Sequence, residues 1–146
     1  MEYKKKSLDR ETLDRLIKLS SMWKDEDICY GINVNCEDDF CEPLYVAVDN
    51  DEIVGYIFGH YYDQKVDSSY ANTGDKCFCL DELYVLPSYR GNGVGSELFR
   101  LIEDEVKDKC MCITLNTSTK DYKSILRLYI EELGMEFRSA FLVKKV

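Results

Sequence analysis

The sequence predicts an α/β protein in which helices flank one mixed β-sheet. First, 146 residues fit a single domain of about 100–200 residues, and no Gly/Ser-rich linker or internal repeat divides the chain, so residues 1–146 should form one unit. Second, a content of 45% apolar residues is typical of a folded core. Third, the spacing at which apolar residues recur changes along the chain between that of a helix and that of a strand. This predicts the order α, hairpin, β, α, β, α, β.

The first half should contain a helix and a hairpin. Leucines recur at nearly helical spacing after Ser7 and Asp9, which are candidate N-caps. Two short apolar runs then surround the polar turn Asp49-Asn50-Asp51-Glu52, which favours a hairpin. The expected elements are a helix at 9–22, an acidic loop with at most one short helix at 23–42, strands at 44–48 and 53–61, and a polar connection at 62–75.

The second half should contain a βαβ unit. An apolar run stops at Pro87, a helical pattern follows the glycines, and a β-rich run comes next, which predicts two parallel strands joined by a helix. Gly134 is a candidate C-cap of a later helix. The expected elements are a strand at 77–86, a helix at 93–109, a strand at 111–115, a helix at 121–132 and a last strand at 137–143.

Charge and composition exclude several classes of partner. The formal charge of -9 disfavours nucleic acid, since such binding needs Lys and Arg to displace counterions. Cationic substrates are the more natural partners for this charge, but net charge on its own favours a role in solubility. No apolar run approaches the roughly 18 residues of a spanning helix, and the N-terminus has no signal-peptide pattern, so no membrane contact is expected. An odd number of cysteines, seven, suits reduced thiols. We therefore expect a cytoplasmic protein.

The most informative segment is a glycine loop between a strand and a helix. Gly91, Gly93 and Gly95 stand at alternate positions, directly before the helical pattern. Glycines let the backbone approach a ligand, and the free N–H groups of a first helical turn bind anions, so a phosphate or pyrophosphate ligand is predicted. A nucleotide P-loop is excluded because Gly95 is followed by Ser96-Glu97 instead of Lys-Ser/Thr. A dinucleotide-binding loop is a minor alternative, because that loop normally follows the first strand of its domain.

Two overlapping motifs resemble a known family. Arg90-Gly91-Asn92-Gly93-Val94-Gly95 resembles the Arg/Gln-x-x-Gly-x-Gly/Ala signature of the GNAT superfamily of acyl-CoA-dependent N-acetyltransferases, and Val85-Leu86-Pro87-Ser88-Tyr89-Arg90 resembles its usual approach. The order of elements is similar over nearly the whole chain. The resemblance implies a GNAT-like fold with acetyl-CoA as cosubstrate.

The resemblance also implies which residues bind the cosubstrate. The main chains of Tyr84 and Val85 would pair with the pantetheine arm, which Asn116 would also contact, and the Val85 N–H would polarise the thioester carbonyl. The pyrophosphate would lie on loop N–H groups, those of Asn92, Gly93, Val94, Gly95 and Ser96, with Gly91 and Arg90 at its edge.

Catalysis by direct attack needs a base for the amine and an acid for the thiolate. Asp81 and Glu82 lie just upstream of Val85; alternation along a strand places them on opposite faces and favours Asp81, which would share a face with Val85, although a β-bulge would reverse this choice. Tyr129 is the candidate acid. It stands five residues before Gly134, one more than the usual Tyr-x-x-x-Gly, so it fits only if the helix end is adjusted.

The acceptor side is predicted to bind a small polycation. Trp23, Asp25 and Glu26 occupy the place of the family's acceptor wall, and this cluster resembles that of aminoglycoside 6′-N-acetyltransferases. Carboxylates and aromatic faces favour an aminoglycoside-like or polyamine-like amine. The alternatives are a peptide, protein or amino-acid N-acetyltransferase and a non-catalytic acyl-CoA-binding module.

The remaining candidates receive no catalytic role. His60, the single histidine, has no neighbouring nucleophile in sequence. Cys77 and Cys79, and Cys110 and Cys112, should lie near one sheet end, but the C-x-C spacing is not that of a zinc site, so no metal is expected. The exposed end of a mixed sheet makes a homodimer plausible.

Overall fold

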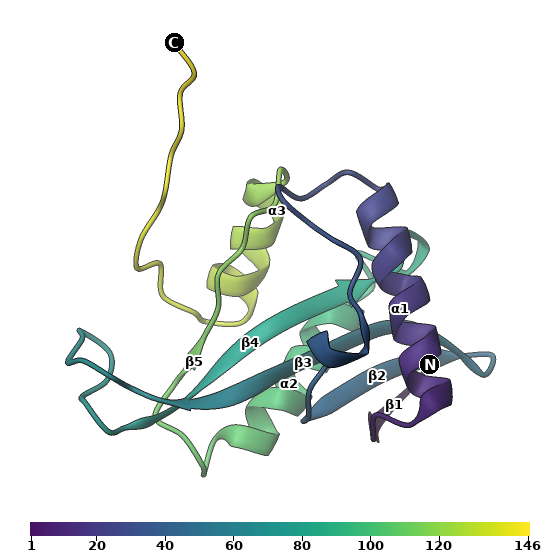
Figure 1. Ribbon diagram of the computed structural model, residues 1–146, viewed down its shortest axis with the longest axis horizontal. Helices are drawn as coiled ribbons and strands as arrows, with labels where there is room; N and C mark the ends of the chain where they lie inside the picture. The colour runs from purple at the N-terminus through teal and green to yellow at the C-terminus, as the bar shows by residue number, and fades with distance from the viewer.

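A computed structural model describes all 146 residues and confirms the α/β class, with one mixed sheet between helices (Figure 1). The strands follow chain order, β1-β2-β3-β4-β5; the first four are antiparallel, and β4 and β5 are parallel. The elements are β1 (Glu2–Lys6), α1 (Arg10–Asp25), β2 (Leu44–Asp49), β3 (Glu52–Asp63), β4 (Lys76–Val85), α2 (Val94–Val106), β5 (Ile113–Thr114) and α3 (Tyr122–Leu126), which continues as a π-helical turn, Arg127–Glu132.

Helices α1 and α2 cover opposite faces of the sheet. Asp9 caps α1, because its carboxylate accepts a hydrogen bond from the Thr12 N–H at 2.8 Å. Leu16 and Leu19 of α1 pack on one core, whereas Leu98 and Ile102 of α2 pack on the other. No helix is both long enough and apolar enough to cross a bilayer.

Strand β1 was not predicted from the sequence. It pairs antiparallel with β2 from Glu2↔Val48 to Lys6↔Leu44. Three consecutive lysines remove the apolar pattern by which a strand is recognised in a sequence. Lysines are common on edge strands, where their charge prevents pairing with another chain. Lys5 reaches across to Glu105 of α2 at 2.8 Å, which fixes this edge to the helix.

The predicted last strand, 137–143, is wrong. This segment pairs with no strand, and Phe141 and Leu142 are 92% and 89% exposed. In Figure 1 the yellow C-terminal segment extends away from the sheet. An apolar run forms a strand only where a neighbouring strand offers enough backbone to pair with, and β5, the strand at this edge, has only two residues, Ile113 and Thr114. The homodimer expected at this sheet end stays a prediction.

A β-bulge lies in the middle of β4. The register with β3 runs Phe58↔Glu82 and then Gly59↔Leu80, so Asp81 is the extra residue. Gly59 is required opposite the bulge, because a Cβ there would clash with the Cys79 carbonyl and the Phe78 ring. The bulge reverses the alternation of every side chain that follows it in β4.

The last helix contains a π-helical turn. The Leu133 N–H donates to the Leu128 carbonyl at 3.0 Å, a spacing of five residues in place of four. The turn holds one more residue than an α-helical turn, and Tyr129 lies inside it, 9% exposed and against Phe99 with ring centroids 6.2 Å apart. Ile130, which stands four residues before Gly134, is 37% exposed.

Candidate active site

The glycine loop connects β4 to α2 and leaves open space around its backbone. Gly91 and Gly93 have φ values of +75° and +77°, which favour glycine, and a Cβ at either would meet nothing within 4 Å. The Glu97 N–H donates the first helical bond, to the Gly93 carbonyl at 3.0 Å. The preceding N–H groups of the first turn therefore lack helical partners, which is the arrangement that the predicted anion site requires; anion binding itself stays a prediction.

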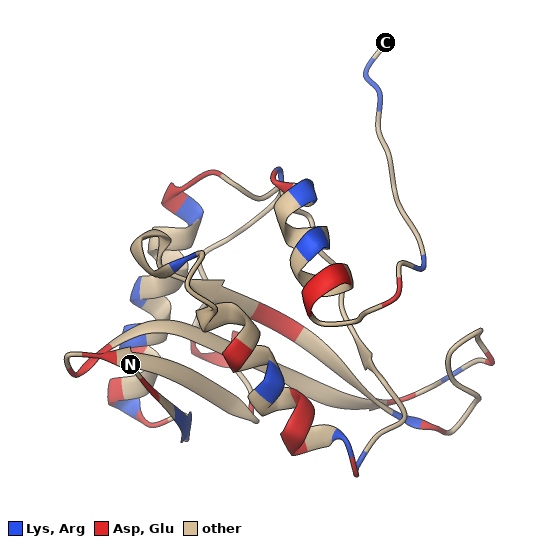
Figure 2. Ribbon diagram, turned by 180° about the vertical axis from the view of Figure 1, so that it is seen from behind, with Lys and Arg blue, Asp and Glu red and all other residues tan.

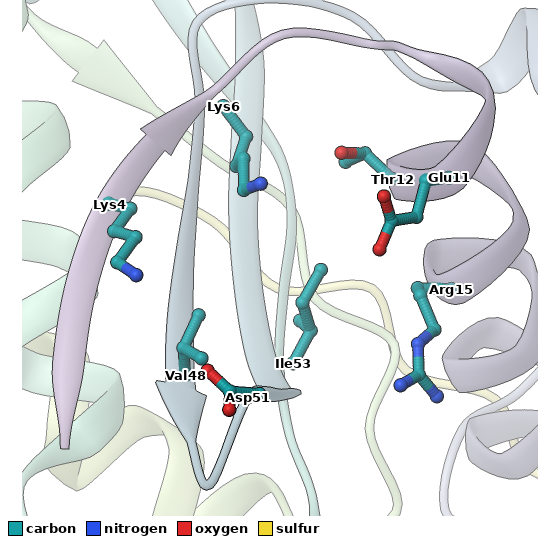
Figure 3. A pocket seen from close by; sticks show the side chains of 8 residues that line it. All are labelled: Lys4, Lys6, Glu11, Thr12, Arg15, Val48, Asp51 and Ile53. Atoms are coloured by element: carbon teal, nitrogen blue, oxygen red, sulfur yellow. The ribbon is translucent and has the colours of Figure 1, made fainter.

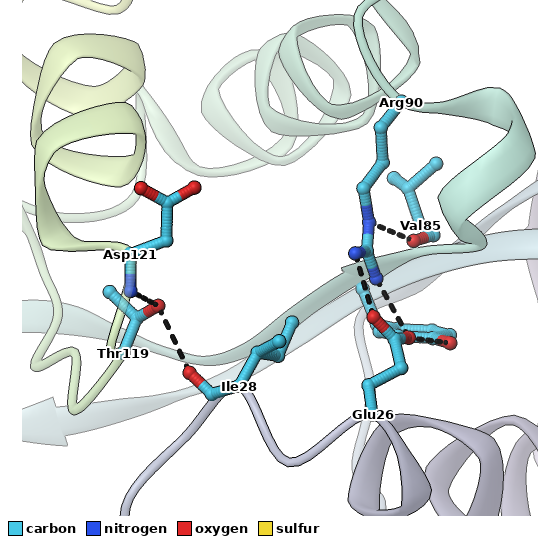
Figure 4. Close-up of polar contacts among 7 residues, drawn as sticks. Glu26, Ile28, Val85, Arg90, Thr119 and Asp121 are labelled. Carbon is cyan, nitrogen blue, oxygen red and sulfur yellow. Dashed lines mark hydrogen bonds and ion pairs between the residues drawn. The ribbon is translucent and has the colours of Figure 1, made fainter.

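Arg90 joins this loop to the end of α1 (Figure 4). Its guanidinium contacts both carboxylate oxygens of Glu26, at 2.7 and 2.9 Å, and its Nε donates to the Val85 carbonyl at 2.7 Å. The Tyr84 hydroxyl donates to the same Glu26 at 2.7 Å, and Trp23 stacks on the Tyr84 ring at 5.1 Å. The Arg90–Glu26 ion pair holds the end of β4 in place, since a bidentate Arg–carboxylate contact is both strong and directional.

The segment after α1 is held at a second point. The Tyr30 N–H donates to the Ser118 carbonyl and the Lys120 N–H to the Ile28 carbonyl, both at 2.8 Å. Figure 4 shows the adjoining contact, in which the Thr119 hydroxyl lies between the Ile28 carbonyl and the Asp121 N–H. The acidic loop is therefore tied to the segment between β5 and α3.

Strands β4 and β5 pair at only two positions, Phe78↔Ile113 and Cys79↔Thr114. Beyond Cys79, the edge of β4 that faces β5 pairs with no strand, up to Val85. Asn116 lies two residues past the end of β5, is exposed and forms no side-chain hydrogen bond within the chain. The two strands thus separate toward the glycine loop and leave main-chain groups of β4 without strand partners.

Glu82 is the more buried of the two candidate bases. Its carboxylate accepts hydrogen bonds from the Tyr56 hydroxyl and the Asn35 side-chain amide, both at 2.8 Å. Burial raises the pKa of Glu82, and the neighbouring charge of Asp81 adds to the increase, while the bonds from Asn35 and Tyr56 oppose it. A carboxyl group with a raised pKa is a better proton acceptor near neutral pH.

Asp81 lies on the same face as Glu82, and this corrects the expectation that the two carboxylates point to opposite faces. Asp81 contacts His60 Nδ1 at 2.7 Å, on the α1 side of the sheet, and Glu82 binds Tyr56 on that side too. Val85 lies on the α2 side, so Asp81 does not share its face. The bulge causes the difference, because it adds one residue between Leu80 and Glu82.

Tyr129 points into the core on the α2 side of the sheet. Its side chain belongs to the α2 core, and burial raises its pKa to about 12, which keeps the hydroxyl protonated at neutral pH. Leu128, the preceding residue, would be 4.0 Å from a Cβ on Gly95. The π-helical turn adjusts the helix end by one residue, and the role of Tyr129 as the acid stays a prediction.

The three predicted acceptor-wall residues fall in different places. Asp25 is exposed at the end of α1, whereas Trp23 covers Tyr84 and Glu26 is occupied by Arg90 and Tyr84. Glu26 is therefore not free to pair with a cationic acceptor. Acidic residues in Figure 2 are distributed over most elements and alternate with basic ones. Asp81 and Glu82, on β4 itself, remain as the candidate carboxylates for the acceptor side.

Two other features lie away from this site. A cavity of about 230 Å³ between β1, the β2–β3 turn and the start of α1 is lined by Lys4, Lys6, Arg15 and Asp51 among others (Figure 3). The sulfurs of Cys77 and Cys112 are 3.6 Å apart where β4 and β5 pair. Neither feature contacts the glycine loop.

Asn35, Tyr56 and Cys41 were missed by sequence reasoning. Tyr56 lies opposite Tyr84 in the β3–β4 register, and only this register brings its hydroxyl to Glu82. Asn35 and Cys41 lie in the loop between α1 and β2, where no periodicity marks a position. The glycine beside the bulge, Gly59, is the one signal that could have suggested the rearranged carboxylates.

A mixed sheet whose parallel strands separate beside a glycine-rich helix start defines the class of acyl-CoA-dependent acetyltransferases. The Acetyltransferase (GNAT) family profile matches residues 10–135, and the chain belongs to this family. It is therefore an acetyl-CoA-dependent N-acetyltransferase by family. A search of curated protein sequences gave no significant match.

Solved structures share the fold at low sequence identity. The aminoglycoside N-acetyltransferase AAC(6')-Iy, in complex with CoA, has a TM-score of 0.66 and 18% identity over 99% of this chain and 100% of its own. A predicted acetyltransferase from Clostridium acetobutylicum, with acetyl-CoA, has a TM-score of 0.68 and 17% identity over 99% and 95%. A ribosomal-protein-alanine N-acetyltransferase from Brucella melitensis has a TM-score of 0.66 and 15% identity over 99% of this chain and 100% of its own. These likenesses confirm the GNAT fold.

Proposed function

We propose that this acetyltransferase transfers the acetyl group of acetyl-CoA to a primary amine of a small cationic acceptor, aminoglycoside-like or polyamine-like. The observation that carries the proposal is the pair of carboxylates, Asp81 and Glu82, on one face of β4 beside its open edge. Carboxylates attract ammonium groups, and more than one of them favours an acceptor with more than one positive charge. The similarity to AAC(6')-Iy supports the aminoglycoside-like choice.

The cosubstrate would bind along the glycine loop and the open edge of β4. Gly91 and Gly93 leave room for the pyrophosphate, and the N–H groups of Asn92 to Ser96 would donate to it at the start of α2. The main chains of Tyr84 and Val85 would pair with pantetheine, with Asn116 on the opposite strand end. Because the Arg90 guanidinium already binds Glu26, Arg90 would act mainly by holding the end of β4 in place. It would lie at the edge of the pyrophosphate site.

Glu82 would accept the proton of the attacking amine, directly or through a water molecule. Its burial places the pKa above the ordinary value, and its hydrogen bonds to Tyr56 and Asn35 fix the carboxylate. The amine nitrogen then forms a bond with the acetyl carbon as the bond from that carbon to sulfur breaks. Tyr129, protonated at neutral pH, would give the departing sulfur its proton. The thioester supplies the activated acyl group.

A panel of amines tests the proposal by release of free thiol from acetyl-CoA. We expect turnover with aminoglycosides or polyamines and little with peptide N-termini or with protein lysines. Turnover with peptides alone would favour the peptide N-acetyltransferase, a fold relative of which is the Brucella melitensis enzyme. No thiol release with any amine, together with measurable binding of acetyl-CoA, would indicate a non-catalytic module.

A further inference from the structure

Three side chains of metal-binding types meet where the bulge of β4 faces β3. Cys41 comes from the segment before β2, His60 from β3 and Asp81 from the bulge, and their ligand atoms all lie within 4.8 Å of one another. The Asp81 Oδ2 atom is 2.7 Å from His60 Nδ1 and 3.5 Å from Cys41 Sγ. One carboxylate oxygen thus joins an imidazole and a thiol that are 19 residues apart in the chain.

We propose that Cys41, His60 and Asp81 bind one zinc ion or a similar divalent transition-metal ion. Thiolate, imidazole and carboxylate are the three side-chain ligands that zinc uses in proteins, and four-coordinate zinc sites often have three protein ligands and one water. Magnesium and calcium are excluded as the preferred ions because they select oxygen ligands. His60 is half exposed, which leaves a path for the ion and for its water ligand.

The charges of the ligand set match a divalent cation. When the ion binds, the Cys41 S–H bond is replaced by a bond from sulfur to the metal and one proton is released to water. His60 binds through Nδ1 in its neutral form and Asp81 through Oδ2, so the two negative ligands balance the charge of the ion.

The site differs from the cysteine pairs that led us to expect a metal-free protein. That expectation rested on the spacing of Cys77, Cys79, Cys110 and Cys112, none of which belongs to this cluster. The site shares Asp81 with the carboxylate pair of the proposed function, but it is defined by its own geometry and its test does not require acetyl transfer. The cluster lies next to Glu82 in sequence, so a bound ion would neutralise the Asp81 charge that raises the Glu82 pKa.

Cobalt(II) titration of the reduced, full-length chain tests the site, since cobalt replaces zinc and absorbs light. We expect one equivalent to produce a thiolate-to-cobalt charge-transfer band and the intense visible bands of a tetrahedral complex, and Zn²⁺ to remove both. The conservative change Cys41→Ser should abolish the charge-transfer band. His60→Gln should weaken cobalt binding at least about tenfold, as loss of a ligand removes a bond to the metal.

Cys112→Ser is the matched control, because Cys112 also has a sulfur neighbour, Cys77, at 3.6 Å, but lies outside the cluster. It should leave the cobalt spectrum unchanged, and circular dichroism should show that each variant is folded. The proposal is overturned if the wild type gives no charge-transfer band. It is also overturned if the band survives Cys41→Ser or disappears with Cys112→Ser, which would assign the metal to the C-x-C pairs.

Discussion

The two sides of the β4 site are built from different parts of the chain. On the proposed cofactor side, the observed features are backbone N–H groups and the positive φ values of Gly91 and Gly93. On the proposed acceptor side, the position of Glu82 depends on the Tyr56 hydroxyl, the Asn35 amide and a bulge in the strand. The difference teaches that substitutions should affect cosubstrate binding through backbone conformation and the chemical step through individual side chains.

The strongest test of this difference is Glu82→Gln. Glutamine keeps the size of the side chain but cannot accept the amine proton, so kcat should fall about 10²–10³-fold, as is usual for loss of a general base. KM for acetyl-CoA should stay nearly constant, because Glu82 lies away from the glycine loop. Steady-state kinetics with a saturating amine measure both constants.

Asp81→Asn is the matched control on the same face of the strand. Because Asp81 is exposed and paired with His60, its neutralisation should lower kcat less than about threefold, in line with the small worth of exposed ion pairs. A larger loss with Asp81→Asn than with Glu82→Gln would reverse the assignment of the base.

Gly93→Ala tests the cofactor side. The new Cβ meets no atom, so the whole effect comes from φ at +77°, where a side chain costs about 1–2 kcal/mol. We expect KM for acetyl-CoA to rise about 5- to 30-fold, the equilibrium change that this energy produces. The value of kcat should change little.

Gly95→Ala is the control for that change, because Gly95 lies within α2 and a Cβ there makes ordinary contacts of 3.9–4.0 Å. Alanine should stabilise the helix by about 0.5–1 kcal/mol in thermal unfolding. An equal increase of KM in both variants would show that side-chain bulk, and not the backbone angle, limits binding.

Tyr129→Phe should have a smaller effect. A thiol has a pKa of about 8.5, so thiolate departs with little help, and we expect kcat to fall about fivefold, below the usual range for a general acid. Phenylalanine retains the packing against Phe99. An unchanged kcat with acetyl-CoA would remove Tyr129 from the mechanism.

The raised pKa of Glu82 predicts the smallest effects, on pH dependence. The rate should rise with pH through a Glu82 pKa that lies above the ordinary value of a glutamate, and Glu82→Gln should lose this step. A pKa raised in the folded protein stabilises it at low pH, and this contribution is lost as pH rises through the folded pKa. Glu82→Gln should therefore be more stable than wild type at neutral pH. Denaturant unfolding at neutral pH and at a pH below the Glu82 pKa should show that this difference disappears in acid.

The sequence predicted what depends on local pattern. The helix capped by Asp9, the hairpin and the loop from Gly91 to Gly95 each carry their signal within a few residues, and the structure confirms them. The faces of Asp81 and Glu82 could not be predicted, because they depend on how β3 and β4 align around Gly59. The strand expected at 137–143 failed for a similar reason, since pairing needs a partner that a local pattern does not supply.

The π-helical turn at Arg127–Glu132 has a consequence for tracing the ancestry of this chain. A single inserted codon normally rotates every later side chain of a helix by about 100°. Here the wider turn absorbs the extra residue, so Tyr129 stays buried and Gly134 still ends the helix. An alignment of this helix with other chains should therefore allow a one-residue gap, because a gapless alignment across the π-helical turn shifts every later residue by one position.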